Sequence, residues 1–214
     1  MKKQILALLC IFAMNSVAIA DDLETYLKAK EAEIDSASKR KNEAQAAASV
    51  RKAAEQGDAK AQVKLGIAYA TGEGIAKDEA QAVEWFRKAA EQGDEKAQVN
   101  LGNMYAEGKG ITRDEAKAVA WYRKAAEQGD VKAQYNLGIA YATGEGIVKD
   151  EAQSVVWFRK AAEQGLADAQ YNLGVAYAEG KGIIKDEAQA VAWFRKAAEQ
   201  GDSDAQANLR QLSK

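Results

Sequence analysis

Arg87-Lys88-Ala89-Ala90-Glu91-Gln92-Gly93 is one of five identical heptapeptides in this chain. The copies occupy residues 51–57, 87–93, 123–129, 159–165 and 195–201, so neighbouring copies are always 36 residues apart. Two aromatic positions recur at the same interval: Trp85, Trp121, Trp157 and Trp193, and Tyr69, Tyr105, Tyr141 and Tyr177. Self-similarity at a fixed period of this length is the signature of a repeat protein. The sequence therefore predicts an array of like units.

Each unit is predicted to contain two helices. In the unit 58–93, the first helix begins at Asp58, a favourable N-cap residue, and ends near Gly72. The second begins at Asp78 and ends at Gly93. Apolar residues at steps of three and four line one face of each helix: Ala61, Leu65, Ala68 and Tyr69 in the first, and Ala82, Trp85 or Phe86, Ala89 and Ala90 in the second. Neither helix can bury its apolar face alone, so we expect an all-α solenoid of stacked two-helix, 36-residue repeats.

The period sets the expected domain boundaries. Residues 21–57 form an N-terminal helical cap that ends in a degenerate half repeat, in which Ser49 and Val50 replace the aromatic pair of the other units. Residues 202–214 form a C-terminal capping helix, because Arg210 stands where the complete units have glycine. Four complete repeats lie between these caps: residues 58–93, 94–129, 130–165 and 166–201.

The first twenty residues have the three parts of a secretory signal. Lys2 and Lys3 precede an apolar run over residues 5–14, and Ala18-Ile-Ala20 offers small residues for cleavage. No later stretch is long and apolar enough for stable membrane insertion. We therefore expect a periplasmic or secreted protein cleaved near Ala20. Lipid attachment at Cys10 is a minor alternative, because the bulky Leu9 precedes it.

The composition after residue 20 excludes several classes of function. Residues 21–214 contain no histidine, cysteine or proline, and removal of Lys2 and Lys3 leaves 28 basic against 32 acidic side chains, a net charge of −4. This balance argues against nucleic acid as a partner. The lack of histidine and cysteine disfavours zinc, haem and histidine-based catalysis, so we expect no metal and no cofactor. Disulfides cannot brace the chain.

The recurrent residues resemble those of the Sel1-like repeat, a relative of the tetratricopeptide repeat. The resemblance covers residues 58–201 and rests on Ala61, Leu65-Gly66, Tyr69, Gly72, Gly74, Asp78, Ala82, Trp85-Phe86, Lys88-Ala89-Ala90 and Gly93 with their counterparts. It implies a right-handed α/α superhelix that serves as a scaffold for protein complexes. Some secreted members of this family hold each unit with a disulfide, for which residues 21–214 lack the cysteines.

Catalysis is the alternative function. Ser36-x-x-Lys39 and Ser49-x-x-Lys52 have the spacing used by serine β-lactamases, and some disulfide-rich relatives are described as penicillin-binding or weakly hydrolysing proteins. The companion Ser-Asp-Asn and Lys-Thr-Gly motifs are missing from this sequence. Carboxylates recur in equivalent positions, which disfavours an acid and base pair in unlike environments. No catalytic residue is therefore assigned.

A binding site is expected instead along the first helices, which line the concave side of such a solenoid. By analogy with the groove of tetratricopeptide proteins, the candidate residues for binding a protein or peptide are Lys60, Val63, Ile67, Lys96, Val99, Asn103, Lys132, Tyr135, Ile139, Asp168, Tyr171 and Val175. Lysines would attract carboxylates, and tyrosine is favoured at binding hot spots. The apolar members could instead pack between neighbouring repeats. The tryptophans are expected in the core.

Overall fold

The computed structural model describes residues 28, 30, 45 and 47–212. The predicted signal segment, the alternative role of Cys10, Ser36-x-x-Lys39 and most of the N-terminal cap lie outside the described residues. The chain divides into two compact units between Ser49 and Val50, and every repeat lies in the second unit. Residues 50–57, the end of the predicted cap, belong to this same unit.

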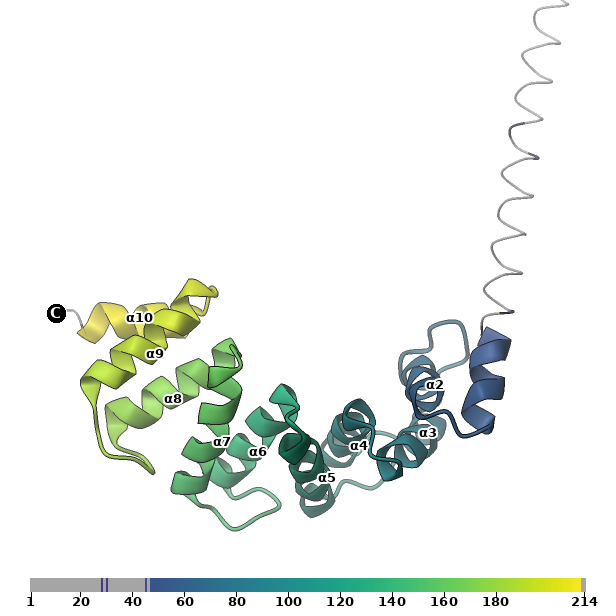
Figure 1. The fold of residues 1–214 in the computed structure, drawn as a ribbon, viewed down its shortest axis with the longest axis horizontal. Coiled ribbons are helices and arrows are strands. Elements are labelled where there is room, and N and C mark those ends of the chain that lie inside the picture. Colours follow the sequence, from purple (N-terminus) through teal and green to yellow (C-terminus); the bar gives the residue numbers. More distant parts are fainter. Residues whose placement is uncertain (1–27, 29, 31–44, 46, 213–214) are drawn as a thin grey trace, which may run out of the picture. The chain divides into compact units, whose positions relative to one another are not determined.

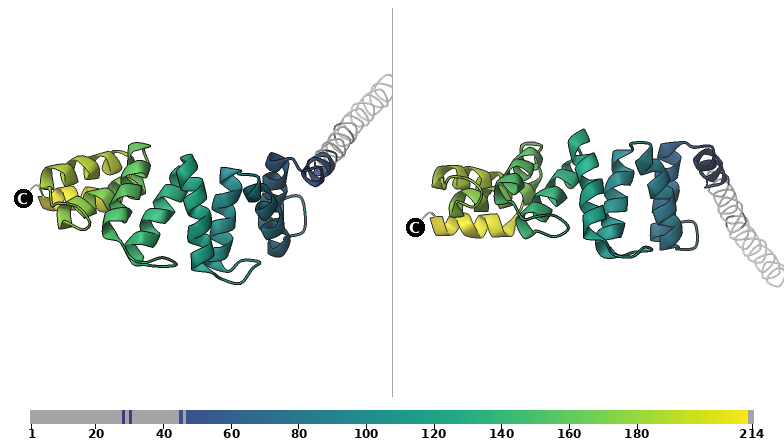
Figure 2. Two further views of the ribbon diagram at one scale, coloured as in Figure 1. Left: turned by 60° about the horizontal axis from the view of Figure 1, so that its bottom comes forward. Right: turned by 90° about the horizontal axis from the view of Figure 1, so that it is seen from below.

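Within the second unit, the described residues fold into helices and turns with no strand. Residues 50–55 are helical and lead into α2. The complete repeats contain α2 (Ala59–Thr71) and α3 (Glu79–Glu91), α4 (Glu95–Glu107) and α5 (Glu115–Gln128), α6 (Val131–Thr143) and α7 (Glu151–Glu163), and α8 (Ala167–Glu179) and α9 (Glu187–Glu199), and α10 (Ser203–Leu212) follows them. Each helix packs on the next in chain order, and the helices form one row (Figures 1 and 2). The predicted all-α solenoid is confirmed.

Aspartates and glycines set the helix ends as the sequence predicts. The carboxylate of Asp58 accepts a hydrogen bond from the Ala61 amide at 2.7 Å, and that of Asp78 accepts from the Gln81 amide at 3.0 Å. Such caps satisfy amides that have no partner within the helix. Leu166 replaces the cap of α8 and makes no side-chain cap bond. Gly72 ends α2 in the left-handed conformation, with φ of 81°.

The core of each repeat is built from alanine and one deeply buried aromatic ring. Phe86 is 2% exposed, and a Cβ atom on Gly66 would lie 2.7 Å from its ring. Gly66 therefore leaves the space that the ring fills. Trp85 is only half-buried, and the ammonium group of Lys88 lies 4.1 Å from the centre of its ring. The prediction that the tryptophans are core residues thus holds in part, because Trp157 is buried whereas the other three are half-buried. A lysine ammonium group lies over each ring, the other pairs being Lys124 and Trp121, Lys160 and Trp157, and Lys196 and Trp193.

A buried glutamine joins consecutive second helices through the first helix between them. The side-chain amide of Gln62, 4% exposed, donates to the carbonyl of Ala54 at 3.1 Å. The amide of Gln92, at the end of α3, donates to the Gln62 side-chain oxygen at 2.7 Å. The same pair of bonds recurs at Gln98, Gln134 and Gln170. Since buried polar groups require partners, these bonds specify how neighbouring repeats are registered.

In repeats 2, 3 and 4, the turn between the two helices contacts the preceding repeat. Gly146, with φ of 71°, lies so close to α5 that a Cβ atom there would be 2.3 Å from the Glu115 carbonyl oxygen. Gly74 has the equivalent place in the first repeat and nearly the same φ, 72°, but no atom of the described residues lies within 4 Å of an added Cβ. The two turns have the same nine-residue sequence, at residues 67–75 and 139–147. A complete repeat precedes only the second turn.

Candidate functional site

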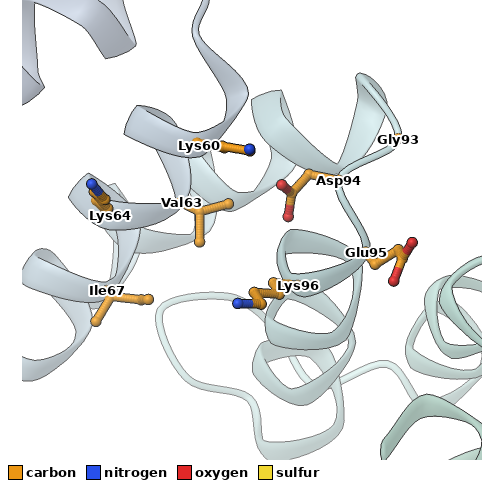
Figure 3. A pocket seen from close by; sticks show the side chains of 8 residues that line it. All are labelled: Lys60, Val63, Lys64, Ile67, Gly93, Asp94, Glu95 and Lys96. Carbon is orange, nitrogen blue, oxygen red and sulfur yellow. The ribbon is translucent and has the colours of Figure 1, made fainter. Parts of the chain in front are cut away.

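One hollow lies between the first helices of repeats 1 and 2, α2 and α4. It has a volume of about 570 Å³ and is lined by Lys60, Val63, Lys64 and Ile67 from α2, and by Gly93, Asp94, Glu95 and Lys96 at the start of α4. Figure 3 shows Lys96 extending from α4 toward Val63 and Ile67, with the carboxylate of Glu95 pointing away. We call the surface formed by the first helices α2, α4, α6, α8 and α10 the first-helix face.

Apolar side chains form the floor of this hollow. Val63 is 6% exposed and Ile67 is 42% exposed, so Ile67 is the member that offers most of its surface to a ligand. The two lysines of α2 that line the hollow are exposed, as is Lys96. A floor of this kind could hold an apolar side chain while the ammonium groups attract carboxylates.

Two smaller hollows lie 72 residues apart in equivalent places. The first, about 310 Å³, lies over the edge of Phe86 between α2 and α4, and the second, about 250 Å³, lies over Phe158 between α6 and α8. Each is also lined by an isoleucine, an asparagine and a lysine at matching positions: Ile67, Asn100 and Lys109, and Ile139, Asn172 and Lys181. The first-helix face therefore presents similar sites more than once.

Tyr122 replaces phenylalanine at the equivalent position of repeat 2. Its hydroxyl donates a hydrogen bond to the Asn103 side-chain oxygen at 2.7 Å, so this oxygen already has a partner within the protein. Burial, followed by the charges of Glu107 and Glu115, raises the pKa of Tyr122 above its ordinary value. The hydroxyl is therefore neutral at physiological pH and has no role as a base.

Two further tyrosines lie half-buried on the first-helix face. The ring of Tyr135 lies 5.9 Å from that of Phe158, and the Tyr171 ring lies 5.8 Å from that of Phe194, both tilted by 44°. Burial and then the Asp168 charge raise the pKa of Tyr135, against the effect of a hydrogen bond from Asn172. These tyrosines pack on the scaffold and leave part of each side chain accessible.

The structure divides the predicted binding residues into three groups. Lys60, Ile67, Lys96, Lys132 and Asp168 are exposed, Asn103, Tyr135, Ile139, Tyr171 and Val175 are half-buried, and Val63 and Val99 are buried. Val99 packs in the core among alanines, Leu137 and Trp157, so its side chain serves packing. The expectation that Val99 presents a binding surface is corrected on this ground, whereas Val63 still lines a hollow.

The sequence analysis missed one recurring position of the first helices, the residue that directly follows Val63 and its counterparts in the other units. It is occupied by Lys64, Asn100, Asn136, Asn172 and Asn208, one per first helix. Lys64 is exposed and the asparagines are half-buried, and four of the five line hollows on the face. The 36-residue recurrence of a polar residue next to the predicted candidates was the available signal.

Other kinds of site find little support in the part of the chain that the structure describes. No cluster of three or more His, Cys, Asp or Glu side chains there could hold a metal ion. Likewise, no described helix is long and apolar enough to cross a membrane. Ser49 and Lys52 are both exposed on the helical segment 47–55.

Residues 50–212 thus define an α-helical repeat solenoid whose hollows lie along its first helices. The model of the Sel1 repeat matches residues 59–94, 95–130, 131–166 and 167–202, one residue later than the predicted unit boundaries. The chain belongs to the Sel1 repeat family. Proteins of this family are generally scaffolds for protein–protein interaction.

Solved structures agree with this assignment. A protective antigen of uropathogenic Escherichia coli is 47% identical, with a TM-score of 0.73 over 74% of this chain and 34% of its own. A Sel1 repeat protein from Oxalobacter formigenes is 41% identical, with a TM-score of 0.72 over 78% of this chain and 48% of its own. Cysteine rich protein B of Helicobacter pylori is 28% identical, with a TM-score of 0.50 over 62% of this chain and 96% of its own. This chain therefore spans about a third of the length of the Escherichia coli protein and about half of that of the Oxalobacter formigenes protein. A search of curated proteins found no match.

Proposed function

We propose that this chain is a non-enzymatic interaction scaffold of the bacterial cell envelope, which binds a protein or peptide along its first-helix face. The hollow between α2 and α4 carries the proposal, because it combines an accessible Ile67 with the ammonium groups of Lys60, Lys64 and Lys96. Apolar anchors flanked by charges are the chemistry with which a groove holds a polypeptide. The signal-like segment 1–20 supports the proposed location.

Capture of partners with a matched pair of variants tests this function. The chain from residue 21 onward is immobilised and exposed to solubilised envelope proteins of the source cell. The variant Lys60→Glu/Ile67→Asp/Lys96→Glu should lose the proteins that the unchanged chain retains. The control Lys124→Glu/Lys160→Glu makes the same two lysine-to-glutamate changes on exposed positions of second helices, without the change at Ile67, and should retain them. Equal capture by both variants, each with an unchanged helical circular dichroism spectrum, would remove the first-helix face from consideration.

Location is tested by cell fractionation. Sequencing of the mature N-terminus should find Asp21 in a periplasmic or secreted fraction. Recovery of the intact N-terminus in the cytoplasm would refute the proposed export.

A β-lactamase-like or penicillin-binding activity is the second candidate, based on Ser49-x-x-Lys52. We expect no nitrocefin hydrolysis above the buffer rate by the purified chain. Hydrolysis that the Ser49→Ala variant abolishes would establish the enzyme alternative.

A further inference from the structure

Charge is distributed unevenly along the first-helix face. The second residue of each first helix is exposed, and it is basic in α2, α4 and α6 but acidic in α8 and α10: Lys60, Lys96 and Lys132, then Asp168 and Asp204. We call these five residues the charge set. Because the helices follow one another along the row (Figure 2), the charge set is basic at one end of the row and acidic at the other.

The charge set is available to a ligand. Within the described part of the chain, none of its members forms an ion pair, whereas lysines of the turns do, such as Lys77 with Glu79 at 2.8 Å and Lys149 with Glu151 at 3.0 Å. Lys64 adds a further unpaired ammonium group at the basic end. The nearby carboxylate of Asp94 accepts the Ala97 amide at 2.9 Å as a helix cap.

Apolar and aromatic groups lie on the same helices as the charge set. Ile67 contributes to the hollow at the basic end, and Tyr135 and Tyr171 are half-buried on α6 and α8. The charge of Asp168 contributes to the raised pKa of Tyr135, so the carboxylate acts across two neighbouring first helices. The acidic end thus adjoins the aromatic middle of the face.

We propose that the first-helix face binds an extended segment of a partner protein in one fixed orientation, set by the charge set. This inference rests on the proposed function. Carboxylates of the segment lie over α2, α4 and α6, apolar side chains occupy the middle, and lysines or arginines lie over α8 and α10. Opposite charges attract along the whole length in this orientation, whereas the reverse places like charges together at both ends.

Two synthetic peptides of equal composition test the charge order. The first carries glutamates at one end, leucine and tyrosine in the middle and lysines at the other end, and the second alternates glutamate and lysine around the same middle. The segregated peptide should bind the chain from residue 21 onward roughly tenfold more tightly at low salt. Added salt should reduce this difference, since it screens exposed charges. Equal affinities would overturn the proposal.

Orientation is measured by energy transfer from a single label. Residues 21–214 contain no cysteine, so Ser203→Cys on α10 places one donor fluorophore beside the acidic end. Transfer should be stronger to an acceptor on the lysine end of the segregated peptide than to one on its glutamate end. A variant in which each Lys of the charge set becomes Asp, and each Asp becomes Lys, should reverse this preference while it keeps the affinity. An unchanged preference would refute the inference.

The remaining outcomes separate this inference from the proposed function. If neither peptide binds, the inference is wrong, while the capture experiment still decides whether the face binds envelope proteins. Self-association of the chain without peptide, lost when the three lysines become aspartate, would assign the face to a second copy and overturn the proposal. Light scattering during size-exclusion chromatography provides that measurement.

Discussion

Substitution of Gly146 by alanine should destabilise the chain far more than the same substitution at Gly74. Both glycines have φ near +70°, where alanine costs about 1–2 kcal/mol. At Gly146 the added Cβ would also lie 2.3 Å from the Glu115 carbonyl oxygen. An ordinary contact is about 3.4 Å, so the turn must move by roughly 1 Å away from α5. Backbone cannot yield as a flexible side chain does, and such overpacking costs about 1–3 kcal/mol more.

Urea unfolding followed by circular dichroism measures this difference directly. Gly74→Ala should lower the free energy of unfolding by about 1–2 kcal/mol, and Gly146→Ala by about 2–5 kcal/mol. The extra loss corresponds to roughly 2–10 °C in melting temperature for a chain of this size. Gly182→Ala is the positional control, because its Cβ would lie 2.1 Å from the Glu151 carbonyl oxygen near the other end of the array. Equal losses at Gly74 and Gly146 would refute the reasoning from inter-repeat contact.

Three further predictions concern the core, the alkaline limit of stability and the surface. Gln134→Leu should lower the free energy of unfolding by about 1–3 kcal/mol, because it removes a buried hydrogen-bonded pair, while the exposed Gln206→Leu should change it by less than about 0.5 kcal/mol; similar losses in urea unfolding would contradict this. Burial raises the pKa of Tyr122 in the folded chain, so the stabilising contribution of this tyrosine is complete below about pH 10 and falls as the pH rises further. Between pH 8 and pH 11, the free energy of unfolding of Tyr122→Phe should therefore fall less than that of the parent. An equal fall in both proteins would exclude this tyrosine as a cause. Val148 and Ile184 are 85% and 88% exposed at turn tips, so threonine at both should leave the melting temperature within about 2 °C, and a larger drop would show that they pack.

The helix ends and the solenoid could be predicted because their causes are local. Aspartate before a helix and glycine after it act within one turn, and the period of 36 residues identifies the unit without any knowledge of contacts. The deepest aromatic was harder to predict. Trp85 and Phe86 both lie near the apolar stripe, and only the space beside Gly66 shows that the phenylalanine is the buried one.

The buried glutamines could not be predicted from residue type, since glutamine is mostly exposed in proteins. Gln62 is buried because the Ala54 carbonyl and Gln92 meet it, and both partners come from other helices. The candidate site was limited in the same way. Val99 was a candidate because of its place in the repeat, but it is buried in a cluster with Leu137 and Trp157 of the next repeat. The assignment of the remaining residues to ligand binding stays a prediction.

The glutamine bridges make the number of repeats adjustable. Each bridge joins only helices that are neighbours in the row, and the same bonds occur at Gln62, Gln98, Gln134 and Gln170. Duplication or deletion of a whole 36-residue unit would therefore join chemically equivalent surfaces and leave every remaining bridge complete. The extent of the first-helix face would therefore change in steps of one repeat, and the packing of the remaining repeats would need no redesign.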